Sequence, residues 1–341
     1  MTAPVRFALV GTGVMGSLHA RVIAQSARTR LATVVEPREA VGREIADRYG
    51  AAWAPDLTDL SDVDAVVIAA PTEYHHNLAE QVLSADKPLL IEKPVCSSLS
   101  ATEEIVATAE KRRLPLLCGL LERFNPAVLT ALALVDRPVH LTVTRHSPYA
   151  PRIRTGVAWD LLVHDVDLAI QAFGGQEPAK VRGSLGYFHP ASMGGAEDVA
   201  EAVLTFGNGA LANVSASRIG QRKVRTLVIS EVDRLIEADL IRKDVTIYRH
   251  VSLDAATPDG RGYRQQSIME VPELVSNREP LAAQLDHFVD ILDGRIDQDV
   301  ERQRILPAHR AVAAVMDDNA LPPRTPRPRT ADGVETATAV S

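Results

Sequence analysis

Short apolar runs alternate with helical stretches along the first part of the chain. The runs are apolar on both faces, as strands buried in a parallel sheet are, and they span residues 5–10, 31–35, 64–70, 88–91 and 115–118. Residues 38–49 and 75–85 predict helices, and Ser100 with Glu103 predicts the capping box of a third. Alternating strands and helices predict a doubly wound, Rossmann-type α/β domain with a parallel sheet over residues 1–122.

The pattern changes after Phe124. Helical stretches at 127–135 and 158–173 flank a half-buried strand at 140–146, and strand-like segments then follow one another at 181–188, 199–206, 210–217, 224–230 and 245–250. Consecutive strands without helices between them predict a C-terminal α+β domain, residues 123–319, with a mostly antiparallel, open-faced sheet. We expect late helices at 280–292 and 303–316 that pack back on the first domain, and a flexible tail over residues 320–341.

The first strand ends in a glycine turn, Gly11-Thr12-Gly13-Val14-Met15-Gly16, and an apolar helical run follows it. In this context the turn indicates a dinucleotide site, because the glycines let a pyrophosphate approach the backbone at a helix N-terminus. The second strand ends in Glu36, where a carboxylate can bind the ribose diol of adenosine. Glu36 would repel a 2′-phosphate and so favours NAD over NADP, whereas Arg38 could bind such a phosphate.

Composition and charge exclude several classes of function. The 341 residues carry a net charge of -7 without a long run of one sign, so nucleic-acid binding is not expected. No apolar run reaches membrane-spanning length, and we expect no signal peptide before the first strand. The two cysteines, Cys96 and Cys118, form neither a metal motif nor a disulfide framework. We therefore expect a cytoplasmic protein without a bound metal.

Two groups of residues suit hydride transfer, which needs a proton acceptor beside a carbinol carbon and cations near its oxygen. Lys93 follows the strand at 88–91, at the sheet edge where ligands bind; a solvated loop lysine is an equal alternative. Asp160, His164 and Asp167 share one helix face, where the imidazole could accept a hydroxyl proton. A hydrogen-bonded structural histidine remains the alternative, and no further ligand motif supports a metal at these residues.

These motifs together resemble the Gfo/Idh/MocA oxidoreductases over about residues 5–320. The resemblance lies in the glycine turn, Pro71-Thr72-Glu73-Tyr74-His75, Glu92-Lys93-Pro94, and Asp160 with His164-Asp165-Val166-Asp167. It implies that Lys93, Asp160 and His164 are the catalytic set, with His164 as the acid/base oriented by Asp160. It also implies that Pro71, Thr72, His75 and Glu92 line the NAD site beside Lys93, and that a cis bond precedes Pro94.

Within the family, the segment 122–126 and the helix around His164 look closest to members of the UDP-N-acetylglucosamine 3-dehydrogenase type. That similarity predicts a substrate site that includes Lys93, Arg123, Asn125, Arg145, Tyr149, Arg152, Arg154, Asp160 and His164. Arg145, Arg152 and Arg154 would bind a diphosphate, and Tyr149 would stack on a base or sugar; a solvated polar loop is the alternative. Relatives often carry a glycine turn where this chain has Glu231-Val232-Asp233-Arg234.

We therefore expect an NAD-dependent dehydrogenase or reductase that acts on a ring carbinol carbon of a sugar, in particular of a nucleotide-activated amino sugar. Alternatives are an inositol or free-sugar dehydrogenase, a redox-neutral NAD-dependent glycoside-processing enzyme, and a non-catalytic cofactor sensor. The expected partner is a small-molecule sugar or sugar nucleotide. A homodimer or homotetramer through the open sheet face is expected from the family and from the exposed sheet.

Overall fold

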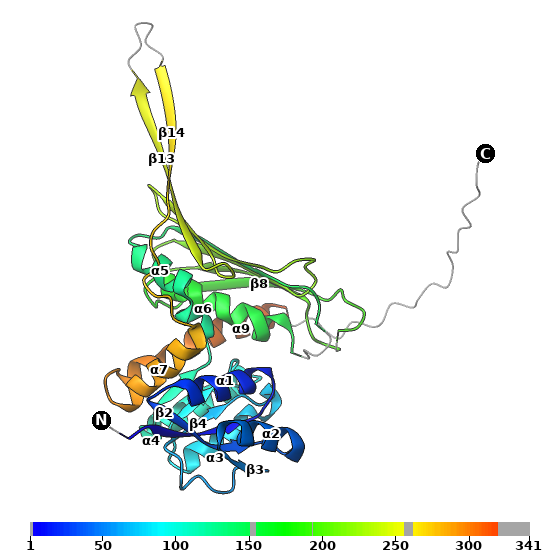
Figure 1. The fold of residues 1–341 in the computed structure, drawn as a ribbon. Helices are drawn as coiled ribbons and strands as arrows, with labels where there is room; N and C mark the ends of the chain where they lie inside the picture. Colours follow the sequence, from blue (N-terminus) through cyan, green and yellow to red (C-terminus); the bar gives the residue numbers. More distant parts are fainter. Residues whose placement is uncertain (1–2, 151–154, 193, 256–261, 320–341) are drawn as a thin grey trace, which may run out of the picture.

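The computed structural model describes residues 3–150, 155–192, 194–255 and 262–319. The predicted tail at 320–341, together with Arg152 and Arg154, lies outside these ranges. Two sheets organise the chain, one of six strands and one of eight. Figure 1 shows the six-stranded sheet with its helices at one end of the molecule and the eight-stranded sheet above it.

The first sheet is entirely parallel and has the order β3-β2-β1-β4-β5-β6. Its strands are β1 (Val5–Val10), β2 (Thr29–Val35), β3 (Ala52–Ala54), β4 (Ala65–Ile68), β5 (Leu89–Ile91) and β6 (Leu116–Cys118). The helices between them are α1 (Val14–Gln25), α2 (Glu39–Tyr49), α3 (His75–Ser84) and α4 (Leu99–Arg112). The strand order reverses between β1 and β4, and such a switch point opens the crevice in which ligands of these folds bind. The predicted doubly wound domain is confirmed.

Apolar side chains fill both faces of this sheet. Successive residues of β1 belong to different cores: Ala8 packs on one face, and Phe7 on the other. Phe7 meets Phe288 of α7 (Pro280–Leu292) at 6.1 Å between ring centroids. A helix from the far end of the chain thus covers one face of the first sheet beside α1.

The second sheet has the order β14-β13-β12-β11-β7-β10-β9-β8 and is antiparallel except for the pair β7–β10. Its strands are β7 (His140–His146), β8 (Lys180–Gly186), β9 (Val199–Thr205), β10 (Leu211–Ser217), β11 (Val224–Ser230), β12 (Leu235–Asp239), β13 (Asp244–Ala255) and β14 (Gly262–Glu270). Helices α5 (Pro126–Leu134), α6 (Val163–Ala172) and α9 (Leu306–Asp318) lie on one face (Figure 1). Along β9 alternate residues are buried, so the other face is open, as predicted.

The structure departs from the sequence-based prediction at several element boundaries. Ser98, and not Ser100, caps α4 by accepting the Ala101 N–H. The strands β12 and β14 and the short helix α8 (Gln298–Gln303) were not predicted, and β13 with β14 forms a hairpin that projects from the body (Figure 1). At the turn without glycine, the Glu231 N–H donates to the Arg234 carbonyl, and the two side chains form an ion pair.

Two further features limit what the molecule can do. The thiol of Cys96 is buried, which raises its pKa to about 12, so it is a small core side chain and not a reactive nucleophile. Among the residues that the structure describes, no helix combines the length and the apolar character that crossing a membrane requires.

Candidate active site

The glycine turn between β1 and α1 forms one wall of the site. Gly11 has φ +90°, and a Cβ there would lie 2.8 Å from the Ala69 carbonyl oxygen. A Cβ on Gly16 would lie 2.0 Å from the Gly11 carbonyl oxygen, so only glycine allows the helix to approach the turn this closely. No side chain caps α1 at Gly13, which leaves its first N–H groups available to an anion.

A cavity of about 310 Å³ opens beside this turn. Its lining consists of Gly11, Thr12, Gly13, Val14, Met15, Glu36, Arg38, Ala69, Ala70, Pro71, His75, Glu92 and Lys93. A neighbouring cavity of about 640 Å³ shares Gly11, Glu36 and Arg38 and extends to Leu57 and Tyr74. The predicted cofactor residues are thereby brought together, with Thr72 next to Pro71 at the start of a 3₁₀ turn, Thr72–Tyr74. Free helix N–H groups, an acidic residue at the end of the second strand and an adjoining apolar cavity are features that fit a dinucleotide.

Glu36 holds a fixed negative charge at the point where the two cavities meet. Its Oε2 accepts hydrogen bonds from the Thr12 N–H at 3.1 Å and the Thr12 hydroxyl at 2.7 Å, and its Oε1 accepts one from Arg38 Nε at 2.7 Å. The hydrogen bond from Arg38, together with those from Thr12, lowers the pKa of Glu36 to about 2. The carboxylate is therefore ionised at neutral pH. It forms an ion pair with the guanidinium of Arg38.

The segment Glu92-Lys93-Pro94 follows β5 at the carboxyl edge of the first sheet. Glu92 Oε1 lies 2.8 Å from His19 Nε2 of α1, and Glu92 Oε2 accepts the Lys93 N–H at 3.3 Å. His75 is 1% exposed, and its ring nitrogens lie 2.9 Å from the carbonyl oxygens of Ala70 and Pro94. The Lys93–Pro94 bond is cis, as expected. These bonds hold Lys93 at the rim of the cofactor cavity.

Lys93 reaches across to Asp160, which belongs to the second domain. Its Nζ donates to Asp160 Oδ1 at 2.6 Å and to the Asp160 carbonyl at 2.7 Å. Asp160 Oδ2 forms a second ion pair, at 2.8 Å, with Arg218. Burial opposes ionisation here, but the charges of Lys93 and Arg218 hold the pKa of Asp160 below its usual value. Asp160 is thus an anion between two cations.

Arg218 was not predicted from the sequence. It is 3% exposed, directly follows β10, and donates to the Thr155 carbonyl as well as to Asp160. Its position directly after a predicted strand was the available signal. The sequence could not show that this strand end lies beside Asp160.

The predicted contact between Asp160 and His164 is wrong. Both carboxylate oxygens of Asp160 are taken by Lys93 and Arg218, and the buried Nδ1 of His164 has no hydrogen-bond partner. The physical reason is local: residues Ala158–Leu162 form a π-helical turn, and α6 begins only at Val163. A wider turn changes the angle between positions four apart, so these two side chains do not stack as in an α-helix.

His164 is nevertheless in a strongly perturbed environment. Burial lowers its pKa well below 6.5, and the charges of Lys93, Arg145 and Arg225 lower it further. The imidazole is therefore neutral at physiological pH. A neutral imidazole whose residue is only partly buried can accept a proton from a ligand in the cleft.

Two of the arginine predictions are corrected by buried ion pairs. Arg145 is 3% exposed and is held by both oxygens of Asp165 and by Glu122, so its donors are not available to a phosphate. Arg123 forms a two-bond ion pair with Asp167. Asp167 is therefore paired with Arg123 and not with His164, with which it was predicted to share a helix face.

Two other predicted substrate residues have structural partners. Asn125 caps α5 by accepting the Ala127 N–H, and its amide donates to Glu122 and to the Leu240 carbonyl. Tyr149 stacks on His189 at 3.6 Å and donates its hydroxyl to the Ala191 carbonyl. Neither side chain is therefore free to bind a sugar in this arrangement.

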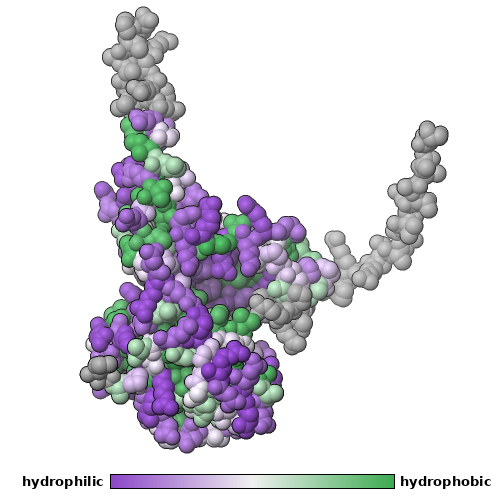
Figure 2. Space-filling view, in the orientation of Figure 1, coloured by the Kyte–Doolittle hydropathy of each residue, from purple (hydrophilic) through white to green (hydrophobic). Residues whose placement is uncertain are grey.

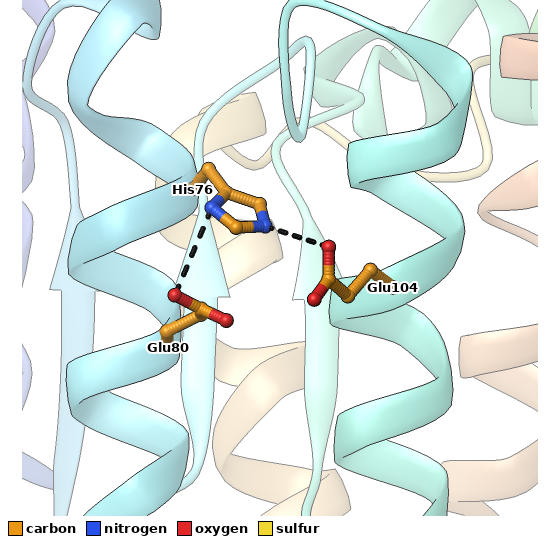
Figure 3. A group of neighbouring side chains, drawn as sticks. All are labelled: His76, Glu80 and Glu104. Carbon is orange, nitrogen blue, oxygen red and sulfur yellow. Dashed lines mark hydrogen bonds and ion pairs between the residues drawn. The ribbon is translucent and has the colours of Figure 1, made fainter.

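A separate cluster on α3 and α4 contains metal-ligating residue types (Figure 3). His76 Nδ1 lies 3.8 Å from Glu80 Oε2, and His76 Nε2 lies 3.1 Å from Glu104 Oε2. The two carboxylates thus lie beside different nitrogens of the ring. A metal ion bound to one ring nitrogen would need both carboxylates beside that same nitrogen. We interpret the cluster as polar contacts that join two surface helices.

Comparison with known proteins identifies the family of the chain. Residues 5–120 match the Gfo/Idh/MocA oxidoreductase family model with an NAD-binding Rossmann fold, and residues 133–231 match the Gfo/Idh/MocA C-terminal domain. UDP-N-acetylglucosamine 3-dehydrogenase of Acidithiobacillus ferrooxidans is 30% identical over 290 residues, which cover 84% of this chain and 88% of the relative. The inositol 2-dehydrogenase of Rhizobium meliloti is 28% identical, over 63% of this chain and 69% of the relative.

Solved structures are similar over the same region. The structure of the A. ferrooxidans enzyme superposes with a TM-score of 0.76 at 28% identity, covering 93% of this chain and 99% of the other. GenD2 from gentamicin A biosynthesis, solved in complex with NAD, gives a TM-score of 0.77 at 25% identity, covering 93% and 95%. The chain is therefore an NAD-dependent oxidoreductase of the Gfo/Idh/MocA family.

Proposed function

We propose that the protein transfers a hydride between NAD and a ring carbinol carbon of a sugar, with Lys93 and His164 handling the hydroxyl group. One observation carries this proposal. Lys93 lines the cofactor cavity and also forms the 2.6 Å ion pair with Asp160 of the second domain. A single side chain thus joins the redox site to the acid/base groups.

The hydrogen bonds of Lys93 leave a donor for the substrate. An ammonium group has three N–H donors, and two of them are used by the side chain and carbonyl of Asp160. The third can donate to the substrate oxygen. That bond strengthens as the oxygen gains negative charge in the transition state, which is the differential binding that accelerates a reaction.

His164 accepts the hydroxyl proton during oxidation and returns it during reduction. Its lowered pKa keeps the ring neutral, so no proton has to leave before the reaction starts. Asp160 acts on Lys93 and not on the imidazole, because both of its oxygens are bound by cations. We therefore assign Asp160 to positioning Lys93.

The chain's own residues provide the cofactor site. The N–H groups at the start of α1 would hold the pyrophosphate, and Glu36 would bind the ribose diol. Bound there, NAD supplies the hydride acceptor. The ionised Glu36 favours NAD over NADP through repulsion of a 2′-phosphate.

For the substrate we propose a nucleotide-activated amino sugar, on the basis of the extent of similarity to the UDP-N-acetylglucosamine 3-dehydrogenase. An inositol or a free sugar is the second candidate, because a relative named inositol 2-dehydrogenase matches much of the chain. Figure 2 shows a hydrophilic hollow between the second sheet and the first domain, which suits a polyol in either case.

Incubation of purified protein with NAD and a panel of UDP-sugars, inositols and free sugars tests the proposal. We expect the absorbance of reduced nicotinamide to rise with UDP-N-acetylglucosamine. Turnover with inositol alone would replace the first substrate by the second. Bound NAD without turnover of any member would contradict the proposed reaction.

We further propose a homodimer or homotetramer that uses the open face of the second sheet. That face carries exposed apolar side chains, including Val203 at 44% and Leu211 at 41% exposure. Light scattering after gel filtration measures the mass, and a monomer at micromolar concentration would contradict this proposal.

A further inference from the structure

Three arginines lie at the same end of three adjacent strands in the middle of the second sheet, β11, β7 and β10. Arg145 is near the end of β7, Arg225 is near the start of β11, and Arg218 follows β10. Arg145 and Arg225 are directly opposite each other in the antiparallel pair β7–β11. Their side chains therefore share the face that α6 covers.

This pairing of like charges is unfavourable. Two cations directly opposite each other across neighbouring strands repel, and the pKa of Arg225 falls below its usual value through burial and the charge of Arg145. Locally unfavourable repulsion of this kind is typical of functional positions, where stabilising interactions elsewhere in the protein offset it.

The three side chains differ in how well their charges are satisfied. Arg145 makes four hydrogen bonds to Asp165 and Glu122, and Arg218 is held by Asp160 and a carbonyl. Arg225 has one hydrogen bond, 3.2 Å long, to the same Glu122 oxygen that Arg145 uses at 2.9 Å. Its side chain is 42% exposed, against 4% for Arg145 and 3% for Arg218. Arg225 is thus the least satisfied cation of the three.

Hydrogen bonds link Arg225 to the helix that carries His164. Arg225 shares the Glu122 carboxylate with Arg145, and Arg145 is bound by Asp165, the residue that follows His164. The charge of Arg225 is also among those that lower the pKa of His164. A guanidinium at this place can form two parallel hydrogen bonds to a phosphate or a carboxylate. We propose that Arg225 is the specificity-determining residue for an oxyanion carried by the substrate, a phosphate ester or a sugar carboxylate.

This inference rests on the proposed function, since it assumes that the substrate binds beside His164. It changes the residue that would bind the anion, because Arg145, a predicted phosphate ligand, and Arg123, a predicted substrate residue, are both paired with buried carboxylates. Arg225 takes their place as the anion ligand among the described residues. An enzyme for neutral polyols would have no need of an exposed guanidinium here.

The test compares Arg225→Gln and Arg225→Lys with Arg222→Gln, which removes the same charge from an exposed position three residues earlier. Binding is measured by calorimetry on protein saturated with NAD, so that the cofactor site is blocked. The probes are UDP for a phosphate and glucuronate for a carboxylate. Michaelis constants for UDP-N-acetylglucosamine and myo-inositol are measured in parallel.

We expect Arg225→Gln to weaken binding of one anionic probe by about tenfold or more, the loss typical of a hydrogen bond to a charged group. Arg225→Lys should recover part of the affinity, and Arg222→Gln should bind as the wild type does. The Michaelis constant for inositol and the affinity for NAD should not change. Arg225→Gln also removes the repulsion across β7–β11, so its melting temperature should not fall.

Unchanged binding of both probes by Arg225→Gln would overturn the inference, as would a loss equal to that of Arg222→Gln. Absence of anion binding by the wild type together with turnover of inositol would also overturn it, while the oxidoreductase function stands. Anion binding that depends on Arg225, without turnover of any substrate, would instead contradict the proposed function.

Discussion

Replacement of Asp160 by Asn tests how the ion pair across the two domains works. The substitution keeps the shape of the side chain but removes its charge. Both oxygens of Asp160 accept hydrogen bonds from cations, Lys93 at 2.6 Å and Arg218 at 2.8 Å. An amide has a single oxygen, so in Asp160→Asn one of the two cations must face an N–H donor.

The size of the effect follows from burial. Removal of one partner of a buried pair costs about 3–5 kcal/mol. Lys93 and Asp160 are 18% and 19% exposed, whereas Arg218 is 3% exposed, so we expect the lower end of that range, about 3 kcal/mol. In the second domain, residues 123–319, such a loss lowers the melting temperature by about 6–12 °C, because a domain of this length loses about 2–4 °C per kcal/mol.

Catalysis should suffer as well. Lys93 keeps its bond to the Asp160 carbonyl at 2.7 Å but loses the ion pair that fixes its direction. A displacement of about 1 Å lowers kcat by about a hundredfold. Affinity for NAD should change less than twofold, because Asp160 does not line the cofactor cavity.

The assay combines thermal denaturation, steady-state kinetics and NAD titration. Asp62→Asn is the matched control, because Asp62 is 95% exposed and lies 3.9 Å from Arg6; it should leave all three quantities unchanged. Wild-type kcat in Asp160→Asn would refute the positioning role. A lowered melting temperature with wild-type kcat would reduce the ion pair to a structural one.

Three further predictions concern the same site. The pKa of His164 lies well below 6.5, so kcat/KM for oxidation should stay level as the pH falls through 6.5 and decline only at lower pH; a decline centred at 6.5 or above would contradict the buried, neutral base. Glu36→Ser removes the charge that repels a 2′-phosphate and frees Arg38, so the ratio of NADP to NAD efficiency should rise about tenfold or more; an unchanged ratio in cofactor kinetics would refute this. Arg218→Gln should lower kcat less than Asp160→Asn does, because the Lys93 ion pair remains; an equal or larger loss, measured in the same kinetic assay, would mean that Arg218 itself contacts the substrate.

The dinucleotide domain could be predicted because its signals are local. The glycine turn follows a strand and precedes a helix, and Lys93 follows another strand of the same parallel sheet. Strand ends on one edge of such a sheet meet in space. Position in the sequence therefore made Lys93 a candidate for this edge, although a solvated loop lysine was an equal alternative, and the structure places Lys93 in the lining of the cavity.

The substrate side depended on contacts between distant residues. Arg145 and Arg225 look alike in the sequence, but Asp165 engages only Arg145, from another element. Residue type alone cannot say which arginine is already paired. The predicted contact between Asp160 and His164 was wrong for a different reason. The residues Ala158–Leu162 form a π-helical turn, and their sequence has no clear signature of such a turn.

The hairpin β13–β14 was missed because β14 is a largely polar sequence without regular alternation. Strand prediction depends on alternation of apolar and polar residues. In the structure β14 is the edge of the sheet and pairs only with β13. Its residues 266–270 are all exposed, so burial does not impose the pattern on that part of the strand.

The most direct test of the central claim is a single-turnover measurement of nicotinamide reduction by protein saturated with NAD and substrate. The account predicts reduction by the wild type, and reduction slower by at least about a hundredfold in Lys93→Met and in His164→Asn, with NAD affinity retained in both variants. Reduction at the wild-type rate by either variant would contradict the assignment of that residue to proton handling. No reduction by the wild type with any sugar, sugar nucleotide or inositol would contradict the proposed hydride transfer itself.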